Sequence, residues 1–180
     1  MERAGVRRST LSQRGELLVT TFGLGRLRPA PGTWGSMPPV VMAGVLIALG
    51  LGPDGTFVNW AVYNGVLALV VVVFSAACVR YGDAAEARFN RKDPGQICAD
   101  ETAGQCLPLM FLPSAAVGTA ASAALTLVGA FLAFRVFDIL KPWPAGRLQD
   151  EPGGWGVLLD DLAAGLMAAV VVQVVVRVVA

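Results

Sequence analysis

The sequence predicts an all-α protein, a multi-pass helical bundle with about five membrane-embedded helices. Hydrophobic residues make up 55 % of the 180-residue chain, and charged residues make up only 15 %. Nearly all ionisable side chains lie in short polar stretches between long apolar runs. Because burying an ion in a bilayer costs several kcal/mol, lipid-exposed segments are poor in charge. A soluble domain of this size would carry more charge and interleave it with apolar residues.

The apolar runs cover residues 37–52, 58–79, 104–134 and 156–180. A transmembrane helix needs about 20 apolar residues, which 58–79 and 115–134 provide, whereas 37–52 is slightly short. Residues 103–112 would cross about half of the hydrocarbon at 1.5 Å per residue. We expect them to form a half-span or re-entrant helix that turns at Pro113 and Ser114. Protein or a polar cavity, rather than lipid, must then surround its ends.

Positive charge indicates the orientation. Arginine and lysine concentrate before residue 37, within 80–92 and within 135–147, whereas the turns at 53–56 and 113–114 contain neither. The positive-inside rule places the large polar segments in the cytoplasm and the turns outside. We expect residues 1–16 to be a disordered cytoplasmic arm and residues 17–180 to be a single helical domain.

Several chemistries are excluded by composition. A net charge of +1 argues against a nucleic-acid partner. The chain has no histidine, which excludes a Ser-His-Asp triad and a phosphohistidine intermediate. The cysteines Cys78, Cys98 and Cys106 form no CxxC pair, so we interpret them as packing residues. Chemistry must therefore rest on carboxylates, a metal, hydroxyls and a few cations.

Two acidic pairs and one further aspartate are predicted at the depth where water meets lipid. Asp100-Glu101 and Asp160-Asp161 stand at the expected starts of apolar helices, and Asp138 lies in an apolar stretch. Such carboxylates can simply cap helices and complement the macrodipole. Their recurrence at the membrane edge favours a functional cluster. Adjacent helical residues point about 100° apart, so we expect one carboxylate of each pair to bind a metal and its neighbour to support it. Oxygen ligands without His or Cys favour Mg²⁺ or Mn²⁺.

Cations and glycine-rich loops suggest phosphate binding. Arg135, Asp138 and Lys141 share a helix face. They are either an ion-pair ladder of little energetic value or a site where the two cations hold a phosphate. The segments 31–35 and 152–156 each read Pro-Gly-x-Trp-Gly before an apolar helix. Their tryptophans suit membrane anchors, and the first loop suits a phosphate cradle, formed by Gly32, Thr33, Gly35 and Ser36. The spacing of Arg80, Asp83 and Glu86 indicates a solvated helical extension.

Taken in order, these motifs resemble the phosphatidylglycerophosphatase A family. The resemblance rests on FGLG at 22–25, APGTWGS at 30–36, KDPG at 92–95, DE at 100–101 with Gly104, FDILKPWP at 137–144, GGWG at 153–156 and DDLAAG at 160–165. It runs from about Leu18 to the last helix. Cys98-Ala99 and Thr102-Ala103 depart from the family pattern around the acidic pair, which affects helix packing more than charge.

The resemblance implies hydrolysis of the terminal phosphate of phosphatidylglycerophosphate to give phosphatidylglycerol, with Mg²⁺, at the bacterial inner membrane. The implied metal ligands are Asp93, Asp100, Glu101, Asp138, Asp160 and Asp161. The implied catalytic residues are Asp100, Glu101, Asp160, Asp161 and Lys141. The implied substrate-binding residues are Gly32, Thr33, Gly35, Ser36, Arg135 and Lys141. Direct attack by water and a covalent phosphoryl intermediate both remain open.

Two other functions share some of these features. A small transporter or ion-binding membrane protein would also use short helices and edge carboxylates, but its polar residues would gather near the midplane. A CDP-alcohol phosphotransferase would carry an Asp-Gly-x-x-Ala-Arg run, which this sequence lacks.

Overall fold

Seven α-helices and three short 3₁₀ segments build the part of the chain described by the computed structural model, residues 11–148, 151 and 153–179. No strand occurs among these residues, which confirms the predicted all-α class. In chain order the elements are α1 Gln13–Val19, η1 Leu24–Arg26, α2 Pro31–Ala48, α3 Phe57–Phe89, α4 Ala99–Cys106, η2 Leu107–Leu109, η3 Ser114–Val117, α5 Ala120–Leu140, α6 Ala145–Leu148 and α7 Gly154–Val179.

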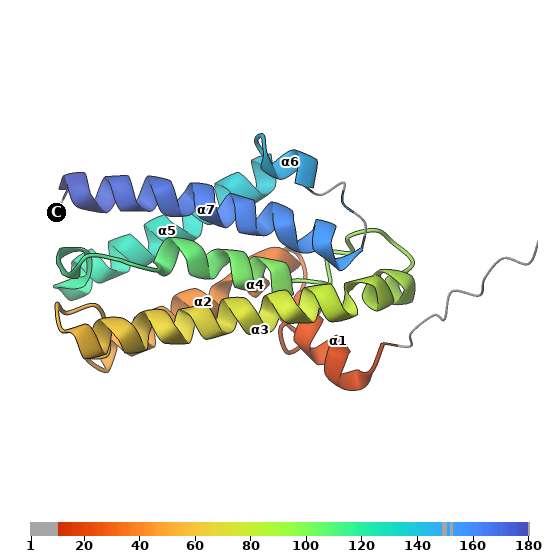
Figure 1. Cartoon of the computed structure of the whole chain (residues 1–180), viewed down its shortest axis with the longest axis horizontal. Coiled ribbons are helices and arrows are strands. Elements are labelled where there is room, and N and C mark those ends of the chain that lie inside the picture. Colours follow the sequence, from red (N-terminus) through yellow and green to blue (C-terminus); the bar gives the residue numbers. More distant parts are fainter. Residues whose placement is uncertain (1–10, 149–150, 152, 180) are drawn as a thin grey trace, which may run out of the picture.

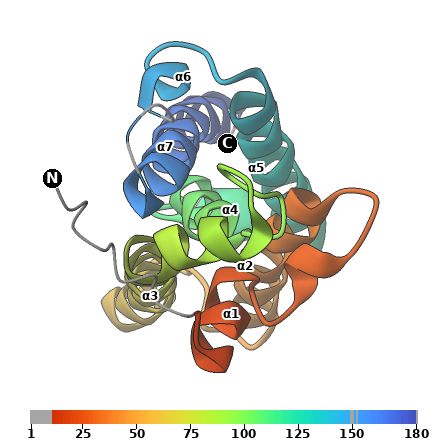
Figure 2. The same cartoon turned by 90° about the vertical axis from the view of Figure 1, so that its right-hand side faces the viewer.

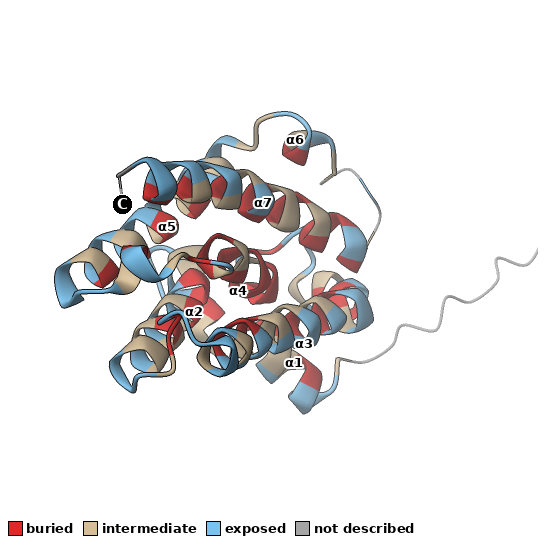
Figure 3. Cartoon of the chain, turned by 60° about the vertical axis from the view of Figure 1, so that its left-hand side comes forward, coloured by how far each residue is buried: buried red, intermediate tan, exposed pale blue. Residues whose placement is uncertain are grey.

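The helix α4 lies at the centre of the bundle. It contacts α2, α3, α5 and α7, which run alongside one another around it (Figures 1 and 2). Figure 3 shows α4 almost wholly buried, while the surrounding helices expose their outward faces. Residues of α4 are therefore shielded from lipid by protein on every side.

Three of the helices are long and apolar enough to cross a membrane: α3, α5 and α7. Their outward faces carry exposed apolar side chains, such as Leu69, Leu125 and Val170. These features indicate a membrane protein with three candidate spans among the described residues, so the predicted number of five embedded helices is not confirmed. Helix α2 ends at Ala48, and its first half contains prolines and polar residues that lower its hydropathy.

The predicted half-span at 103–112 is only partly helical. Residues 103–106 form the last turn of α4, which begins at Ala99 and ends at Cys106, and Leu107–Leu109 form η2. The segment packs inside the bundle, and the chain then turns into η3. Its last carbonyls and amide bind side chains of the neighbouring spans. Tyr63 Oη donates to the Leu109 carbonyl at 3.1 Å, Gln173 Nε2 donates to the Met110 carbonyl at 2.7 Å, and the Phe111 N–H donates to Asn64 Oδ1 at 2.8 Å.

The N-terminal arm predicted at residues 1–16 is only partly described, because residues 1–10 lie outside the described range. Helix α1 begins within the predicted arm, at Gln13, and Ser12 caps it by accepting the Gly15 N–H at 3.1 Å. The ordered helical part therefore starts a few residues before the expected domain boundary.

The turns between α2 and α3 and before η3 lie at one end of the bundle, together with the end of α7 (Figure 1). The arginine-bearing segments, α1, the end of α3 and α6, lie toward the opposite end. This arrangement is the one that the charge pattern predicts.

Candidate active site

Carboxylates of α4 and α7 meet inside the bundle. Asp100 and Glu101 lie in the first turn of α4, and Asp161 lies in the second turn of α7. One oxygen of each of these three side chains lies within 4.8 Å of the others. Both members of the α4 pair thus take part, whereas only Asp161 of the α7 pair does, so the expectation of one ligand from each pair is met only on α7. Asp160 and Asp161 are not at the start of their helix, so they are not caps.

Two glycines allow α4 and α7 to approach. A Cβ atom on Gly165 would lie 2.4 Å from the carbonyl oxygen of Gly104. A Cβ atom on Gly104 would lie 2.6 Å from the carbonyl oxygen of Asp161. Any larger residue would separate the two helix backbones. The glycines of the two sequence motifs therefore set the distance between the acidic groups.

The last turn of α5 brings an aspartate and an arginine to the cluster. Asp138 is buried, with 7 % of its surface exposed, and forms an ion pair with Arg135 one turn earlier. Its charge also acts on Glu101 and Asp161. A carboxylate near a helix C-terminus is unfavourable because it opposes the macrodipole, and the Arg135 pair offsets this cost.

Lys141 ends α5 and reaches across to α7. It is the C-cap residue, in the left-handed region with φ 43°, and its ammonium forms an ion pair with Asp160. Burial lowers the pKa of Lys141, but its hydrogen bond to Asp160 and the surrounding carboxylates outweigh this effect and raise the pKa overall. Lys141 is therefore positively charged at neutral pH, and it pairs with Asp160 rather than with Asp138 in the expected ladder.

The N-terminus of α2 lies directly against the cluster. A Cβ atom on Gly32 would lie 2.2 Å from Glu101 Oε1 and 3.1 Å from Arg135 Nη1. The N–H groups of Gly32 and Thr33 belong to the first turn, where amides have no partner within the helix. Ser36 is fully buried; its hydroxyl donates to the Gly32 carbonyl at 2.8 Å and lies 3.4 Å from Arg135 Nη1.

Gly35 has a different environment from its neighbours in the predicted cradle. Its backbone packs against Cys98, whose Cβ would lie 2.5 Å from a Cβ at position 35. Its carbonyl accepts the Thr102 hydroxyl at 2.8 Å. Gly35 therefore joins α2 to the start of α4, and the structure does not bring it to the carboxylates.

Asp93 lies on an exposed loop beside the cluster. It is not one of the three converging carboxylates, but its charge acts on Glu101, Asp160 and Lys141. The loop is held by Glu86, whose Oε1 accepts the Asp93 N–H at 3.0 Å.

The sequence did not predict the supporting roles of two acidic residues of α3. Asp83 and Glu86 are not simply part of a solvated extension of α3, because each accepts a backbone N–H from another segment. Asp83 Oδ1 accepts the N–H of Gly154, the first residue of α7, at 3.0 Å. The spacing of three between the carboxylates placed them on one helix face, but nothing local in the sequence identifies the amides they bind.

Unsatisfied oxygens suggest that the cluster holds a cation. Four buried carboxylate oxygens have no hydrogen-bond partner among the described residues, namely Asp100 Oδ1, Glu101 Oε2, Asp160 Oδ1 and Asp161 Oδ2. Burial raises the pKa of Asp100, and it raises that of Glu101 to about 7. Several buried carboxylates without partners are costly, and a divalent cation would compensate them. The acidic cluster could therefore bind a metal ion, and its all-oxygen donor set fits a hard cation such as Mg²⁺.

Comparison with known proteins agrees with these motifs. The family model "Phosphatidylglycerophosphatase A" matches residues 17–176. The chain belongs to the phosphatidylglycerophosphatase A family. It is 33 % identical over 162 residues to the phosphatidylglycerophosphatase A of Haemophilus influenzae, covering 87 % of this chain and 85 % of the relative. It is 28 % identical to the enzyme of that name from Escherichia coli K12, covering 90 % of this chain and 83 % of the relative.

A protein of Bacteroides thetaiotaomicron named putative phosphatidylinositol-3-phosphatase is 30 % identical, with 88 % of this chain and 91 % of the relative covered. No solved structure matches the chain. The family match extends from α1 into the last turns of α7 and so includes every helix of the site. As a member of this family, the protein is a phosphatase, as the resemblance implied.

Proposed function

We propose that the protein hydrolyses the terminal phosphomonoester of phosphatidylglycerophosphate, giving phosphatidylglycerol, in a Mg²⁺-dependent reaction at the bacterial inner membrane. The observation that carries this proposal is the group of carboxylates with unpaired buried oxygens, lined by two cations, inside a bundle of membrane-spanning helices. The names of the Haemophilus and Escherichia relatives support the choice of lipid.

The acidic residues would hold the metal. Asp100, Glu101 and Asp161 are the best-placed ligands, and the further candidates Asp93, Asp138 and Asp160 surround them. When bound, Mg²⁺ would offset the charge of the phosphoryl oxygens and lower the pKa of a coordinated water.

The cations and the start of α2 would bind the substrate phosphate. Arg135 and Lys141 flank the carboxylates from α5, and the free N–H groups of Gly32 and Thr33 point from a helix N-terminus, which favours anions. Charged donors fixed by ion pairs need little reorganisation as charge builds on the phosphoryl oxygens. Each of these cations would then bind both its carboxylate partner, Asp138 or Asp160, and the phosphate.

Hydrolysis forms a bond from a water oxygen to phosphorus and breaks the bond from phosphorus to the glycerol oxygen. The water loses a proton, and the glycerol oxygen gains one. A carboxylate of the cluster would accept the first proton, since the chain has no histidine. Ser36 is a poor nucleophile here, because it is fully buried and its hydroxyl is bound to the Gly32 carbonyl. This environment favours direct attack by water.

The position of the site suits a lipid. It lies toward the end of the bundle that carries the arginine-rich segments, which the positive-inside rule places in the cytoplasm. The acyl chains of the substrate would remain at the level of the spans while the head group reaches the carboxylates. The transporter hypothesis is not favoured, since the carboxylates gather toward one end of the described spans.

Phosphate release from phosphatidylglycerophosphate in detergent micelles tests the proposal. Phosphatidic acid and phosphatidylinositol 3-phosphate serve as competing substrates, the latter because of the name of the Bacteroides relative. We expect release that requires Mg²⁺, stops with EDTA and prefers phosphatidylglycerophosphate. A preference for phosphatidylinositol 3-phosphate, or release that persists in EDTA, would contradict the substrate or the metal respectively.

A further inference from the structure

Two buried threonine hydroxyls connect three segments of the chain beside the carboxylate site. Thr102 Oγ1 donates to the Gly35 carbonyl of α2 at 2.8 Å, and Thr21 Oγ1 lies 2.7 Å from Thr102 Oγ1. Both threonines are 1 % exposed. We propose that Thr102, assisted by Thr21, is a positioning residue that holds the first turn of α2 against Glu101, where its N–H groups can bind the substrate phosphate. The inference rests on the proposed function, which assigns the start of α2 to that phosphate.

The sequence of α2 creates the need for a donor from outside the helix. The carbonyl of Gly35 would normally accept the N–H of the residue four positions later, but that residue is Pro39, which has no N–H. Gly35 is buried, and an unpaired buried carbonyl is unfavourable. The Thr102 hydroxyl supplies the missing donor. Among the described residues, this is the one hydrogen bond that joins α2 to α4.

One arrangement of the two hydroxyl protons satisfies the available acceptors. Thr102 Oγ1 also lies 2.9 Å from the Cys98 carbonyl, but that carbonyl already accepts the Thr102 N–H at 3.1 Å. Thr102 therefore donates its hydroxyl proton to Gly35. Thr21 Oγ1 lies closer to Thr102 Oγ1 than to the Cys98 carbonyl, at 2.7 Å against 3.1 Å, so it donates to Thr102. A hydroxyl that accepts a hydrogen bond donates a stronger one, so Thr21 acts on α2 through Thr102.

The backbone at Thr21 is unfavourable for its residue type. Its φ is 43°, in the left-handed region where β-branched residues are rare. Such a conformation persists where the surrounding contacts determine it strongly. The contact here is the hydroxyl, which the turn directs inward to Thr102. The Thr21–Thr102 pair thus contributes to the placement of the turn as well as of α2.

The pair lies next to the groups that it would position. Thr102 follows Glu101 in α4, and Gly35 lies about one turn after Gly32 in α2. A Cβ atom on Gly32 would lie 2.2 Å from Glu101 Oε1, so the start of α2 touches the acidic turn of α4. If α2 moved away, the N–H groups of Gly32 and Thr33 would withdraw from a phosphate held by the cations of α5. The carboxylates of α4 and α7 would keep their positions.

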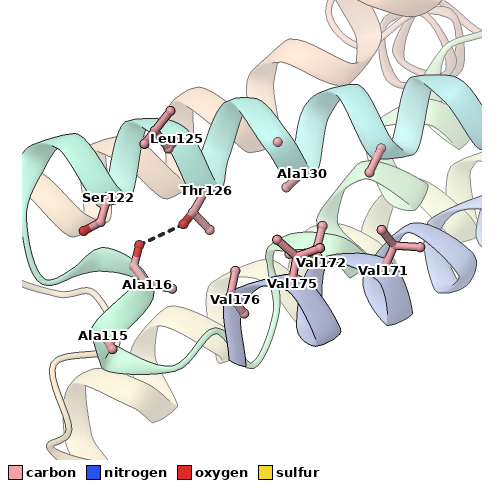
Figure 4. Close-up of a pocket in the computed structure, with 12 residues that line it drawn as sticks. Ala115, Ala116, Ser122, Leu125, Thr126, Ala130, Val171, Val172, Val175 and Val176 are labelled. Atoms are coloured by element: carbon pink, nitrogen blue, oxygen red, sulfur yellow. Dashed lines mark hydrogen bonds between the residues drawn. The ribbon is translucent and has the colours of Figure 1, made fainter. Parts of the chain in front are cut away.

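Removing only the hydroxyl tests the inference. Thr102→Val keeps nearly the same side-chain shape but leaves the Gly35 carbonyl without a donor, whereas Thr102→Ser keeps the donor. Thr126→Val is the matched control, because Thr126 Oγ1 donates to the Ala116 carbonyl at the same distance, 2.8 Å, and joins α5 to η3 away from the carboxylates (Figure 4). The measurements are KM and kcat with phosphatidylglycerophosphate, and the binding of inorganic phosphate and of Mg²⁺ by titration calorimetry.

We expect Thr102→Val to raise KM and the dissociation constant of inorganic phosphate about tenfold, with kcat and Mg²⁺ affinity within about twofold of the wild type. Contacts made equally in the ground state and the transition state affect KM alone. Thr102→Ser should restore the wild-type values, and Thr126→Val should leave them unchanged.

Two results with Thr102→Val would overturn the inference. One is an unchanged KM and phosphate affinity, with at most a lower unfolding temperature, because the hydroxyl would then serve stability alone. The other is a loss of Mg²⁺ affinity as large as that of phosphate affinity, because the hydroxyl would then support α4 rather than α2. Failure of the proposed function has a different signature, in which the wild-type protein releases no phosphate from the lipid.

A second threonine variant tests the order of the two hydroxyls. Thr21→Val weakens the bond to Gly35 without removing it, so KM should rise about two- to threefold. It provides the same test if Thr102→Val does not fold. Because Thr21 acts through Thr102, the double variant Thr21→Val/Thr102→Val should have the KM of Thr102→Val alone. Independent increases that multiply in the double variant, or an unchanged KM in Thr21→Val, would contradict the assigned order.

Discussion

Asp161 brings a carboxylate of α7 to the acidic first turn of α4. It is 3 % exposed, faces Asp100 and Glu101, and adjoins Asp138. Four carboxylates so close together repel one another, and the Arg135 and Lys141 pairs neutralise only part of the charge. The arrangement is unfavourable for stability alone, which is typical of residues kept for binding or catalysis.

Asp161→Asn therefore separates function from folding. Loss of a metal ligand should lower phosphate release at least about 100-fold. Loss of one buried negative charge should leave the unfolding temperature in EDTA equal to or above that of the wild type. Activity assays and thermal unfolding in detergent measure the two effects. Wild-type activity in the variant would remove Asp161 from the site.

The pKa of Glu101 predicts a pH dependence. Burial raises this pKa from 4.5 to about 7. Between these values the folded protein holds a proton that the unfolded chain has lost, so the stability of the metal-free protein falls as pH rises through this window. Metal binds the deprotonated carboxylates, so stabilisation by Mg²⁺ should grow over the same window.

Thermal unfolding in EDTA and in Mg²⁺, at several pH values between 4.5 and 8, measures both trends. Glu101→Gln, which does not titrate, should flatten the metal-free profile. A Mg²⁺-induced shift in unfolding temperature that does not change with pH would contradict the role of Glu101.

At the scale of elements, the contact between α4 and α7 is the critical one. Gly104 and Gly165 hold the helices close enough for their carboxylates to converge. The central position of α4, within a ring of longer helices, keeps its acidic turn out of lipid (Figure 2). A short helix that could not span a bilayer is thereby able to carry the site.

Gly165→Ala should push these helices apart. The added Cβ would lie 2.4 Å from a backbone oxygen of α4, which cannot move aside as a flexible side chain can. We expect a loss of about 1–3 kcal/mol in the free energy of unfolding, together with weaker Mg²⁺ binding. Gly65→Ala, with no neighbour within 4 Å, is the control and should be neutral or slightly stabilising. Equal behaviour of the two variants would show that the close contact is unimportant.

The sequence predicts much of the fold and of the candidate site because the signals are local. Long apolar runs predicted α3, α5 and α7, and the motifs predicted residues that now lie beside one another, such as Glu101 and Gly32. What it could not predict depends on tertiary packing. The pairing of Lys141 with Asp160 and the packing of Gly35 against Cys98 join separate segments of the chain. The hydrogen bond from the Gly154 N–H to Asp83 joins residues that are 71 positions apart. The number of membrane-embedded helices could not be predicted either, because it depends on whether lipid or protein surrounds α4.

For the molecule as a whole, the central question is which side of the membrane the site faces. The three cysteines are buried, so they should give little background in labelling experiments. Cysteine introduced at Thr56 should react with a membrane-impermeant maleimide in intact cells. Cysteine introduced at Arg91 should react only after permeabilisation, because the arginine-bearing end is predicted to be cytoplasmic. The opposite pattern would place the carboxylate site outside.

The whole molecule is a bundle whose interior carries a carboxylate site and whose candidate spans expose apolar side chains. The acidic interior is compatible with a membrane protein because the surrounding helices present their apolar faces outward (Figure 3). A lipid phosphate, with one charged and one apolar end, matches both features.

The position of the metal tests the central claim most directly. We would measure anomalous scattering from crystals of the protein soaked with Mn²⁺, an ion with the same oxygen preference as Mg²⁺. We predict a peak between Asp100, Glu101 and Asp161, with carboxylate oxygens at about 2 Å, and its loss in Asp161→Asn. A peak elsewhere, or none in crystals of a preparation shown to be active, would contradict the assignment of these carboxylates to the catalytic metal.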